Sequence, residues 1–383
     1  MEHNLKKLNF TIVTHVYTTG PSFKLEDYLK DKVNSLVFIG HPFSFSEDTR
    51  SFLRVYNKGK LMIDKKFPKW KGSEFIFYLK DLLLTFYWYL KYSTKNDYFI
   101  GVNNFNVFAG LLLRLFTDVG RIVFYTIDYV PQRFKNPVLN SIYHWLDRFA
   151  ILKSHRVWNL SSIMVEEREK RGVDTHHRKK QIVVQIGADI SPKLAPINKV
   201  KRHRIVFLGH LLRKQGVELL VSAMKDVVRK VPLAHLLIIG GGELEEKLKR
   251  DVLRLELEKH VKFTGFVKEF YDVQRLLKDS AIAVAPYVDD SSTYTRYTDP
   301  GKPKDYMASG LPVVITKVPQ VAWEIQKNKC GFAIDYKKEQ LVEALVKLLK
   351  NDSLWSSFRR NAFKMAKKYE WKKIFDRAFS QTI

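Results

Sequence analysis

The residues best suited to chemistry lie in one segment, DPGKPKDYMASGLPVVIT, which runs from Asp299 to Thr316. Its glycine and prolines favour a tight loop. A helix beginning near Lys302 would direct its amino-terminal dipole and a lysine ammonium at an anion such as a diphosphate. Asp305, one helical turn later, can accept hydrogen bonds from a diol such as ribose. The alternative is a capped surface helix in which Lys302 and Asp305 form an ordinary i, i+3 pair.

Glycines also follow three predicted strands in the same half of the chain. Gly209 follows HRIVFL, Gly241 lies in the triplet after HLLII, and Gly265 follows VKFT. Glycine allows close approach of the backbone to a ligand, and open α/β sheets bind ligands outside the carboxyl ends of their strands. Each glycine alone can be a plain turn, but together they predict one sheet edge lined by ligand-binding loops.

Short apolar runs alternate with helical patterns along most of the chain, which predicts βαβ units and parallel sheets. A length of 383 residues exceeds what one hydrophobic core usually supports. Residues 187–202 are polar and contain prolines, as an interdomain linker would. We therefore expect an α/β fold of two doubly wound, Rossmann-like domains that face a central cleft, residues 1–190 and 191–368, with a basic β-hairpin near residues 52–66 and a final helix at 369–383.

Composition narrows the class of protein and its compartment. The single cysteine, Cys330, excludes an intrachain disulfide, and the start of the chain has no apolar core of signal-peptide length, so we expect a cytoplasmic protein. No His or Cys cluster has metal-ligand spacing, so we expect no obligatory metal. The formal charge of +26 predicts a polyanionic partner.

Lysines and aromatic residues gather in one stretch of the first predicted domain. KGKLMIDKKFPKWKG contains Lys65, Lys66, Lys69 and Trp70, and FIFYLKDLLLTFYWYLKY follows it closely. This combination suits an anionic membrane surface. The alternatives are a buried amphipathic helix beside a solvated hairpin, and a nucleic-acid-binding surface. No zinc-finger spacing or RNP motif accompanies the charge, so we expect membrane contact and no nucleic acid.

The segment PGKPKDYMASGLPVV resembles the PxKxx[ED]YMAxGxPVV signature of the GT-B glycosyltransferases of family 4, the glycosyl transferases group 1. FLGHLLRKQGVELL is similar to the strand, phosphate loop and helix of that family, and the resemblance covers roughly residues 181–315. It implies the GT-B fold, a nucleoside diphosphate sugar as co-substrate, and a C-terminal helix that crosses back to the first domain.

The resemblance also implies roles for individual residues. The donor site would use Gly20, Gly209, Gly241, the basic side chain of Arg213 or Lys214, Lys302, the pair Phe266 and Val267 against the nucleobase, and Asp305 on the ribose. Asp128 and His15 are the candidates for a catalytic base or an acceptor-orienting group, with Arg133 as an acceptor contact. The alternatives are a satisfied loop aspartate and a packed histidine.

Three positions depart from the family pattern. Tyr297 stands where a second carboxylate is usual, His210 where an arginine is common, and Gln215 where a lysine precedes the glycine. Because of Tyr297 we do not carry over the retaining stereochemistry. Asp299, or Asp289 with Asp290, can take over a sugar contact.

These features together predict a hexosyltransferase-type enzyme at the inner face of the cell membrane. It would move a sugar from a UDP- or GDP-sugar to a lipid-linked or glycan acceptor, in bacterial cell-surface glycan or exopolysaccharide synthesis. The alternatives are a nucleic-acid-binding protein and a GT-B nucleotide-sugar epimerase. A basic, aromatic first domain favours transfer to a lipid-linked acceptor over epimerisation.

Overall fold

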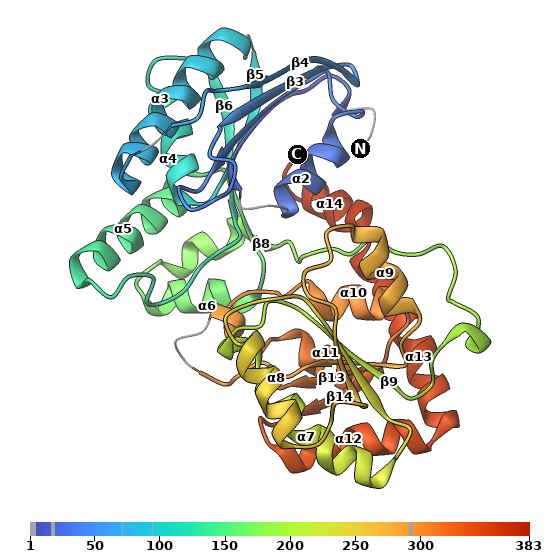
Figure 1. The fold of residues 1–383 in the computed structure, drawn as a ribbon. Coiled ribbons are helices and arrows are strands. Elements are labelled where there is room, and N and C mark those ends of the chain that lie inside the picture. The colour runs from blue at the N-terminus through green and yellow to red at the C-terminus, as the bar shows by residue number, and fades with distance from the viewer. Residues whose placement is uncertain (1–4, 17–19, 71, 94, 291–293) are drawn as a thin grey trace. The chain divides into compact units, whose positions relative to one another are not determined.

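A computed structural model of the chain describes residues 5–16, 20–70, 72–93, 95–290 and 294–383. The chain divides into two compact units, each built on one sheet (Figure 1). Unit 1 comprises Met1–Gln185 together with Trp371–Ile383, and unit 2 comprises Ile186–Glu370.

Unit 1 contains an eight-stranded sheet in the order β4-β3-β2-β1-β5-β6-β7-β8. The six strands from β2 to β8 in that order run parallel, β3 is antiparallel to β2, and β4 is antiparallel to β3. Because β1 pairs with both β2 and β5, the strand order reverses at β1, as in a doubly wound sheet. The strand bounds are β1 Asn9–Val16, β2 Ser35–Pro42, β3 Phe52–Asn57, β4 Lys60–Lys66, β5 Asn96–Val102, β6 Val119–Thr126, β7 Arg156–Asn159 and β8 Gln181–Val183.

Strands β3 and β4 form a hairpin that extends the parallel sheet at one edge. Its two turn residues, Lys58 and Gly59, have φ angles of 47° and 83°. Two consecutive positive φ angles are what a type I′ hairpin turn requires. The Lys-Gly pair in the sequence therefore sets the position of the turn.

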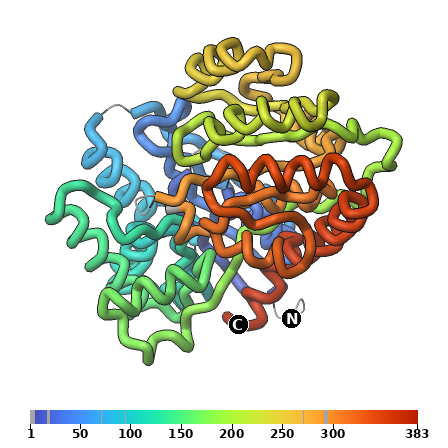
Figure 2. Tube along the Cα trace, turned by 90° about the horizontal axis from the view of Figure 1, so that it is seen from below, coloured from blue at the N-terminus to red at the C-terminus, as the bar shows by residue number. Residues whose placement is uncertain are grey.

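The helices of unit 1 cover both faces of its sheet (Figure 1). Leu84 and Trp88 of α3, Val107 of α4 and Ile151 of α5 share one hydrophobic core with the strands. Figures 1 and 2 both draw α14 beside α2, where the Tyr28 hydroxyl donates to Asp376 Oδ1 at 2.7 Å. The helix bounds are α2 Pro21–Leu29, α3 Glu74–Tyr92, α4 Asn104–Leu113, α5 Pro137–Lys153, α6 Ser162–Lys170 and α14 Trp371–Ser380, with a 3₁₀ turn at Thr175–Lys180.

Helix α4 is shorter than the sequence predicts. The apolar pattern predicts a helix to Phe116, but α4 ends at Leu113. The Thr117 backbone N–H and its hydroxyl both donate to the Leu113 carbonyl, at 2.9 and 2.8 Å, and so cap the helix. As a result, Leu115 and Phe116 project from the end of the helix and are 72% and 78% exposed.

Unit 2 contains a six-stranded, all-parallel sheet in the order β11-β10-β9-β12-β13-β14. In chain order this is 3-2-1-4-5-6, the arrangement of dinucleotide-binding folds. The two sheets confirm the predicted α/β fold class. The strand bounds are β9 Arg204–Leu208, β10 His235–Ile239, β11 Val261–Phe263, β12 Ile282–Ala285, β13 Val313–Thr316 and β14 Gly331–Ile334.

Seven α-helices in the described part of unit 2 cover this sheet, and α7 packs against α12 (Figure 2). Helices α11 and α12, with β14 between them, complete a stretch for which the alternation above predicts no elements. The helix bounds are α7 Val217–Lys230, α8 Glu245–Arg254, α9 Phe270–Lys278, α10 Lys302–Ala308, α11 Val321–Lys327, α12 Lys338–Lys350 and α13 Asp352–Ala366, with 3₁₀ turns at Ile197–Lys199, Arg213–Gln215, Tyr294–Arg296 and Lys367–Tyr369.

A buried ion pair fixes helix α10 in unit 2. The Lys304 ammonium pairs with the Asp299 carboxylate, donates to the Ile186 carbonyl at 2.7 Å, and lies 4.4 Å from the centre of the Tyr369 ring. Asp299 also accepts the Ile186 N–H at 2.7 Å. On the same helix, the Tyr306 hydroxyl accepts the Leu208 N–H at 2.8 Å. The helix is thus tied both to the start of unit 2 and to the end of β9.

We predict that Lys304→Met lowers the free energy of unfolding of unit 2 by about 3–5 kcal/mol, because it leaves the Asp299 carboxylate buried without its counter-charge. Denaturant unfolding monitored by circular dichroism measures this change. Lys302→Met on the same helix is the control and should change stability much less. Equal stability of both variants would contradict a structural role for the ion pair.

Candidate functional site

The strand order of unit 2 places its ligand-binding edge between β9 and β12. These neighbouring strands belong to the two halves of the sheet, and open α/β sheets bind ligands where the order reverses. Gly209 follows β9 at this point. The 3₁₀ turn Arg213–Gln215 leads from there into α7, and Lys302 begins α10.

Lys302 reaches across this edge to Gly209. Its Nζ donates to Gln215 Oε1 at 3.0 Å. A Cβ atom added to Gly209 would lie 2.4 Å from the same Nζ, so only glycine leaves room for the ammonium. Gln215, which departs from the family pattern, is therefore the hydrogen-bond acceptor that holds this lysine.

The surroundings of Lys302 are electropositive. Burial and, to a smaller extent, the neighbouring Lys214 lower the pKa of Lys302 to about 8, and Asp305 opposes these effects. Burial also lowers the pKa of His210, with added repulsion from Lys302 and Lys214. These groups therefore form a positive site, in which an anion would supply counter-charge.

The glycine-containing loops after β9, β10 and β11 are tied to one another. Gly240 donates to the Gly265 carbonyl at 3.0 Å, and Leu211 donates to the Gly241 carbonyl at 3.0 Å. Gly240 has a φ of +125°, and a Cβ there would lie 2.1 Å from the Gly209 carbonyl oxygen. The loop contacts require glycine at this position, as the repeated strand-end glycines suggested.

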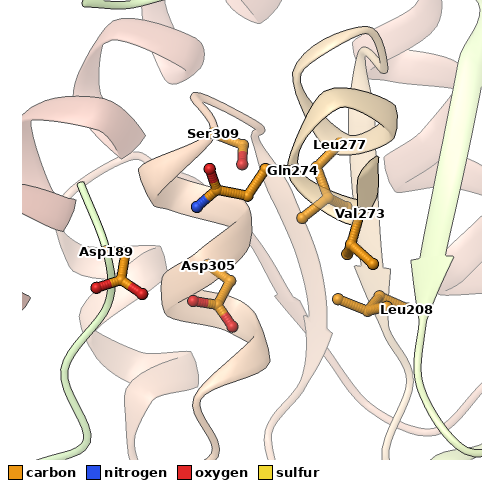
Figure 3. A pocket seen from close by; sticks show the side chains of 7 residues that line it. All are labelled: Asp189, Leu208, Val273, Gln274, Leu277, Asp305 and Ser309. Carbon is orange, nitrogen blue, oxygen red and sulfur yellow. The ribbon is translucent and has the colours of Figure 1, made fainter. Parts of the chain in front are cut away.

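A small pocket lies beside α10, and Asp305 is one of its lining residues (Figure 3). Ser309 lies one turn further along the helix and also lines the pocket. Neither Ser309 nor Gln274 was predicted from the sequence, although the i, i+4 spacing of Asp305 and Ser309 was a signal for the former. The full set of lining residues is Asp189, Leu208, Val273, Gln274, Leu277, Asp305 and Ser309.

The remaining donor-site candidates differ in accessibility. Phe266 is 76% exposed, whereas Val267 is half-buried and packs on the core of unit 2. Arg213 lies near Tyr336. Burial raises the pKa of the Tyr336 hydroxyl, and the positive charge of Arg213 opposes this shift. Of the two basic candidates, Lys214 is therefore the one that interacts with Lys302.

Two of the carboxylates considered as replacements for the acid absent at Tyr297, Asp299 and Asp289, form ion pairs with neighbouring residues. Asp299 is buried in its ion pair with Lys304, so it is not available to a sugar, and Lys304 adds no free positive charge. Asp289 pairs with Arg296. Both ion pairs are local, which is why the composition of the loop alone did not reveal them.

In unit 1, His15 stands at the carboxyl end of β1, and both its ring nitrogens are hydrogen-bonded. Nε2 lies 3.2 Å from Asp81 Oδ2. Nδ1 lies 3.1 Å from the amide nitrogen of Asn106, which also donates to the Val102 carbonyl. Although burial raises a carboxyl pKa, hydrogen bonds from His15 and His41 hold the pKa of Asp81 well below its ordinary value. His15 thus has the contacts of a packed histidine.

The other candidates of unit 1 occupy loops. Asp128 is half-buried after β6, and its carbonyl accepts the Tyr143 hydroxyl at 3.2 Å. Gly20 precedes α2, and a Cβ there would meet no atom within 4 Å. The residues just before it, 17–19, lie outside the described chain. Arg133 is exposed and lies close enough to Tyr78 to influence its pKa.

The basic residues of the hairpin region are exposed. Lys66 Nζ lies 3.2 Å from Asp48, Lys65 Nζ lies 3.5 Å from the Tyr92 hydroxyl, and Trp70 is 41% exposed beside Lys69. Across the described chain, no group of three His, Cys, Asp or Glu side chains is placed to hold a metal ion.

Comparison with known proteins agrees with this geometry. Residues 202–351 match the family model of the glycosyl transferases group 1. An uncharacterized glycosyltransferase of Haemophilus influenzae is 27% identical over 180 residues, which is 46% of this chain and 48% of that protein. Poly(glycerol-phosphate) alpha-glucosyltransferase of Bacillus subtilis is 26% identical over 171 residues, or 44% of this chain and 24% of that protein. The matches thus span about a quarter to a half of these relatives.

Solved structures share the fold at low sequence identity. Sucrose-phosphate synthase of Thermosynechococcus elongatus has a TM-score of 0.71 at 13% identity, covering 98% of this chain and 99% of that one. HepE of Anabaena, solved with UDP and glucose, has a TM-score of 0.70 at 13% identity, covering 97% and 98%. Residues 202–351 therefore match the glycosyl transferases group 1 family, and the chain has the fold of the GT-B glycosyltransferases.

Proposed function

We propose that this chain is a hexosyltransferase that uses a nucleoside diphosphate sugar, a UDP- or GDP-sugar, and acts on a lipid-linked or glycan acceptor in bacterial cell-surface glycan synthesis. Its place would be the inner face of the cell membrane. The observation that carries the proposal is the desolvated Lys302 ammonium, held against Gly209 at the reversal point of the unit 2 sheet.

A diphosphate fits this position for an electrostatic reason. In the free protein the Lys302 ammonium is buried next to Lys214, and burial together with this neighbouring charge lowers its pKa to about 8. A diphosphate would supply the missing counter-charge, and the same cations would stabilise the negative charge that develops on it as the glycosyl bond breaks. Transfer would thus be assisted by groups already oriented before the donor binds.

Asp305 and its pocket suit the nucleoside. A carboxylate can accept hydrogen bonds from both hydroxyls of a ribose. The pocket also offers the apolar side chains of Val273 and Leu277, beside the polar groups of Gln274 and Ser309. In the known structures, HepE was solved with UDP, and TarM of S. aureus was solved with UDP and alpha-GlcNAc-glycerol. These complexes favour UDP as the first nucleotide to test.

Asp128 and Arg133 remain the proposed acceptor-side residues of unit 1. Asp128 is preferred over His15 as the base because both ring nitrogens of His15 are engaged by Asp81 and Asn106. An imidazole can accept a proton from a substrate hydroxyl only through a free ring nitrogen. His15 therefore suits a role in packing this end of β1.

We predict that UDP-glucose, or the corresponding GDP-sugar, stabilises the wild-type protein in a thermal-shift assay. At about 100-fold excess over its dissociation constant the donor should add roughly 2.7 kcal/mol. Lys302→Met should remove most of this stabilisation by a diphosphate donor, and Asp305→Asn should weaken it through the ribose. Lys327→Met, which removes an exposed lysine of α11, is the matched control and should respond as the wild type does.

An equal response of Lys302→Met and Lys327→Met would contradict the placement of the diphosphate. The absence of any shift with a panel of UDP-, GDP- and ADP-sugars would contradict the proposed donor class itself.

We also predict that donor affinity falls as the pH rises. Binding of the diphosphate requires the Lys302 ammonium, and the pKa of that group in the free protein is about 8. The proton is therefore already present below that pH and is lost above it. Titration calorimetry with UDP-glucose from about pH 7 to about pH 9 should show a rising dissociation constant. Lys302→Met should bind weakly and show a nearly flat profile, whereas a flat wild-type profile would contradict the role of Lys302.

A further inference from the structure

Helix α3 of unit 1 buries the two charged residues of its central stretch and exposes a row of large apolar residues. In the described stretch Phe75–Leu90, no exposed or half-exposed side chain is charged. The two charged residues of that stretch, Lys80 and Asp81, are 6% and 2% exposed and pair with each other at 2.9 Å. A helix facing water normally shows the opposite pattern.

The buried polar side of α3 is fully used within unit 1. Lys80 Nζ donates to the Ser51 hydroxyl at 3.0 Å, Asp81 binds both His15 and His41, and His41 Nε2 lies 2.9 Å from the Thr85 hydroxyl. These contacts fix the rotation of the helix. The buried hydrogen bonds and ion pairs of Lys80, Asp81 and Thr85 therefore keep the apolar side of the helix turned outward. Its members, all more than 40% exposed, are Phe75, Ile76, Leu79, Leu83, Tyr87 and Leu90.

Helix α5 repeats the arrangement. Its single acid, Asp147, is buried in an ion pair with Arg168. Its exposed side carries apolar residues one or two turns apart, namely Val138, Ile142, Trp145 and Leu152. The exposed charges of α5 are both positive, Arg148 and Lys153.

These two outer sides lie on the same side of unit 1. Helix α4 packs between α3 and α5, and all three cover one face of the sheet (Figure 1). Beyond the end of α4, Leu115 and Phe116 project into solvent. We call the outer sides of α3 and α5, together with Leu115 and Phe116, the apolar face. Single exposed apolar residues are common on proteins, but a set spread over the two helices that flank α4 marks an interaction surface.

Positive side chains lie close to the apolar face. Lys65 and Lys91 lie at the rings of Tyr92 and Tyr87 at the end of α3, and Arg114 precedes the projecting Leu115. Glu74 is the one exposed acid of the two described helices. An apolar surface edged by cations is complementary to a bilayer that contains anionic lipid, where apolar side chains enter the interface and lysines meet phosphate groups.

We propose that the apolar face seats unit 1 on an anionic lipid bilayer, with α3 and α5 lying in the plane of the interface. None of the described helices has the length and apolar character needed to cross a bilayer. A second copy of the chain fits less well, because a two-fold pairing would bring the same cationic edges together. This proposal rests on the membrane location within the proposed function and identifies the surface that makes the contact. Its test does not depend on donor binding.

Co-sedimentation with vesicles tests this surface. We expect the wild type to bind vesicles of phosphatidylcholine with about 30% phosphatidylglycerol and to lose binding as salt is raised. Leu83→Glu on α3 and Ile142→Glu on α5 should each weaken partitioning by about tenfold or more. Leu253→Glu is the matched control, because Leu253 of α8 is 59% exposed and Leu83 is 62% exposed. This variant should bind as the wild type does.

Three outcomes would overturn the proposal. They are equal binding by Leu83→Glu and Leu253→Glu, no binding by a folded wild type, and a wild-type dimer in light scattering that Leu83→Glu converts to a monomer. Thermal unfolding of each variant, with and without UDP-glucose, separates the two proposals. Loss of vesicle binding with the UDP-glucose shift retained is the result expected of Leu83→Glu. Vesicle binding by a wild type without any nucleotide-sugar shift would contradict the donor proposal and support this one.

Discussion

The buried ion pair between Lys304 and Asp299 is the interaction on which the site of unit 2 depends. It joins α10 to the backbone of Ile186, through the carbonyl on one side and the N–H on the other. Two charges inside a protein are stable only when their geometry is good and their remaining hydrogen-bonding groups are satisfied. This requirement fixes where α10 begins, and the Tyr306 hydroxyl then fixes the same helix against the end of β9.

Lys302 lies on the same helix, two residues before Lys304, but it has different contacts. Its Nζ meets Gln215 and the bare backbone of Gly209 instead of a buried carboxylate, and repulsion from Lys214 adds to the effect of burial on its pKa. Burial of a positive group in this manner raises the free energy of the unliganded protein, and a bound anion would offset that increase. The segment that carries the family signature therefore contains one lysine that stabilises the fold, Lys304, and one that we propose for the ligand, Lys302.

The fold was largely predictable because it follows from alternation. Strand-like runs bounded by glycines and helical patterns between them indicated both sheets, and Lys58 with Gly59 indicated the hairpin turn. The division of labour between Lys302 and Lys304 was not predictable, since both lysines stand in the same short segment and only the position of Ile186, far away in sequence, distinguishes them. Asp299 was a candidate sugar contact for the same reason. Helix α3 shows a related limit: the sequence indicates an apolar helix but not that Lys80 and Asp81 point inward, because their partners Ser51, His15 and His41 come from other elements.

A crystal structure of the protein with bound UDP would test the central claim most directly. We expect diphosphate oxygens within hydrogen-bond distance of Lys302 Nζ, beside the Gly209 backbone, with the ribose hydroxyls at the Asp305 carboxylate. A diphosphate bound away from Lys302, with that lysine still on Gln215 and Asp305 without a ribose contact, would contradict it.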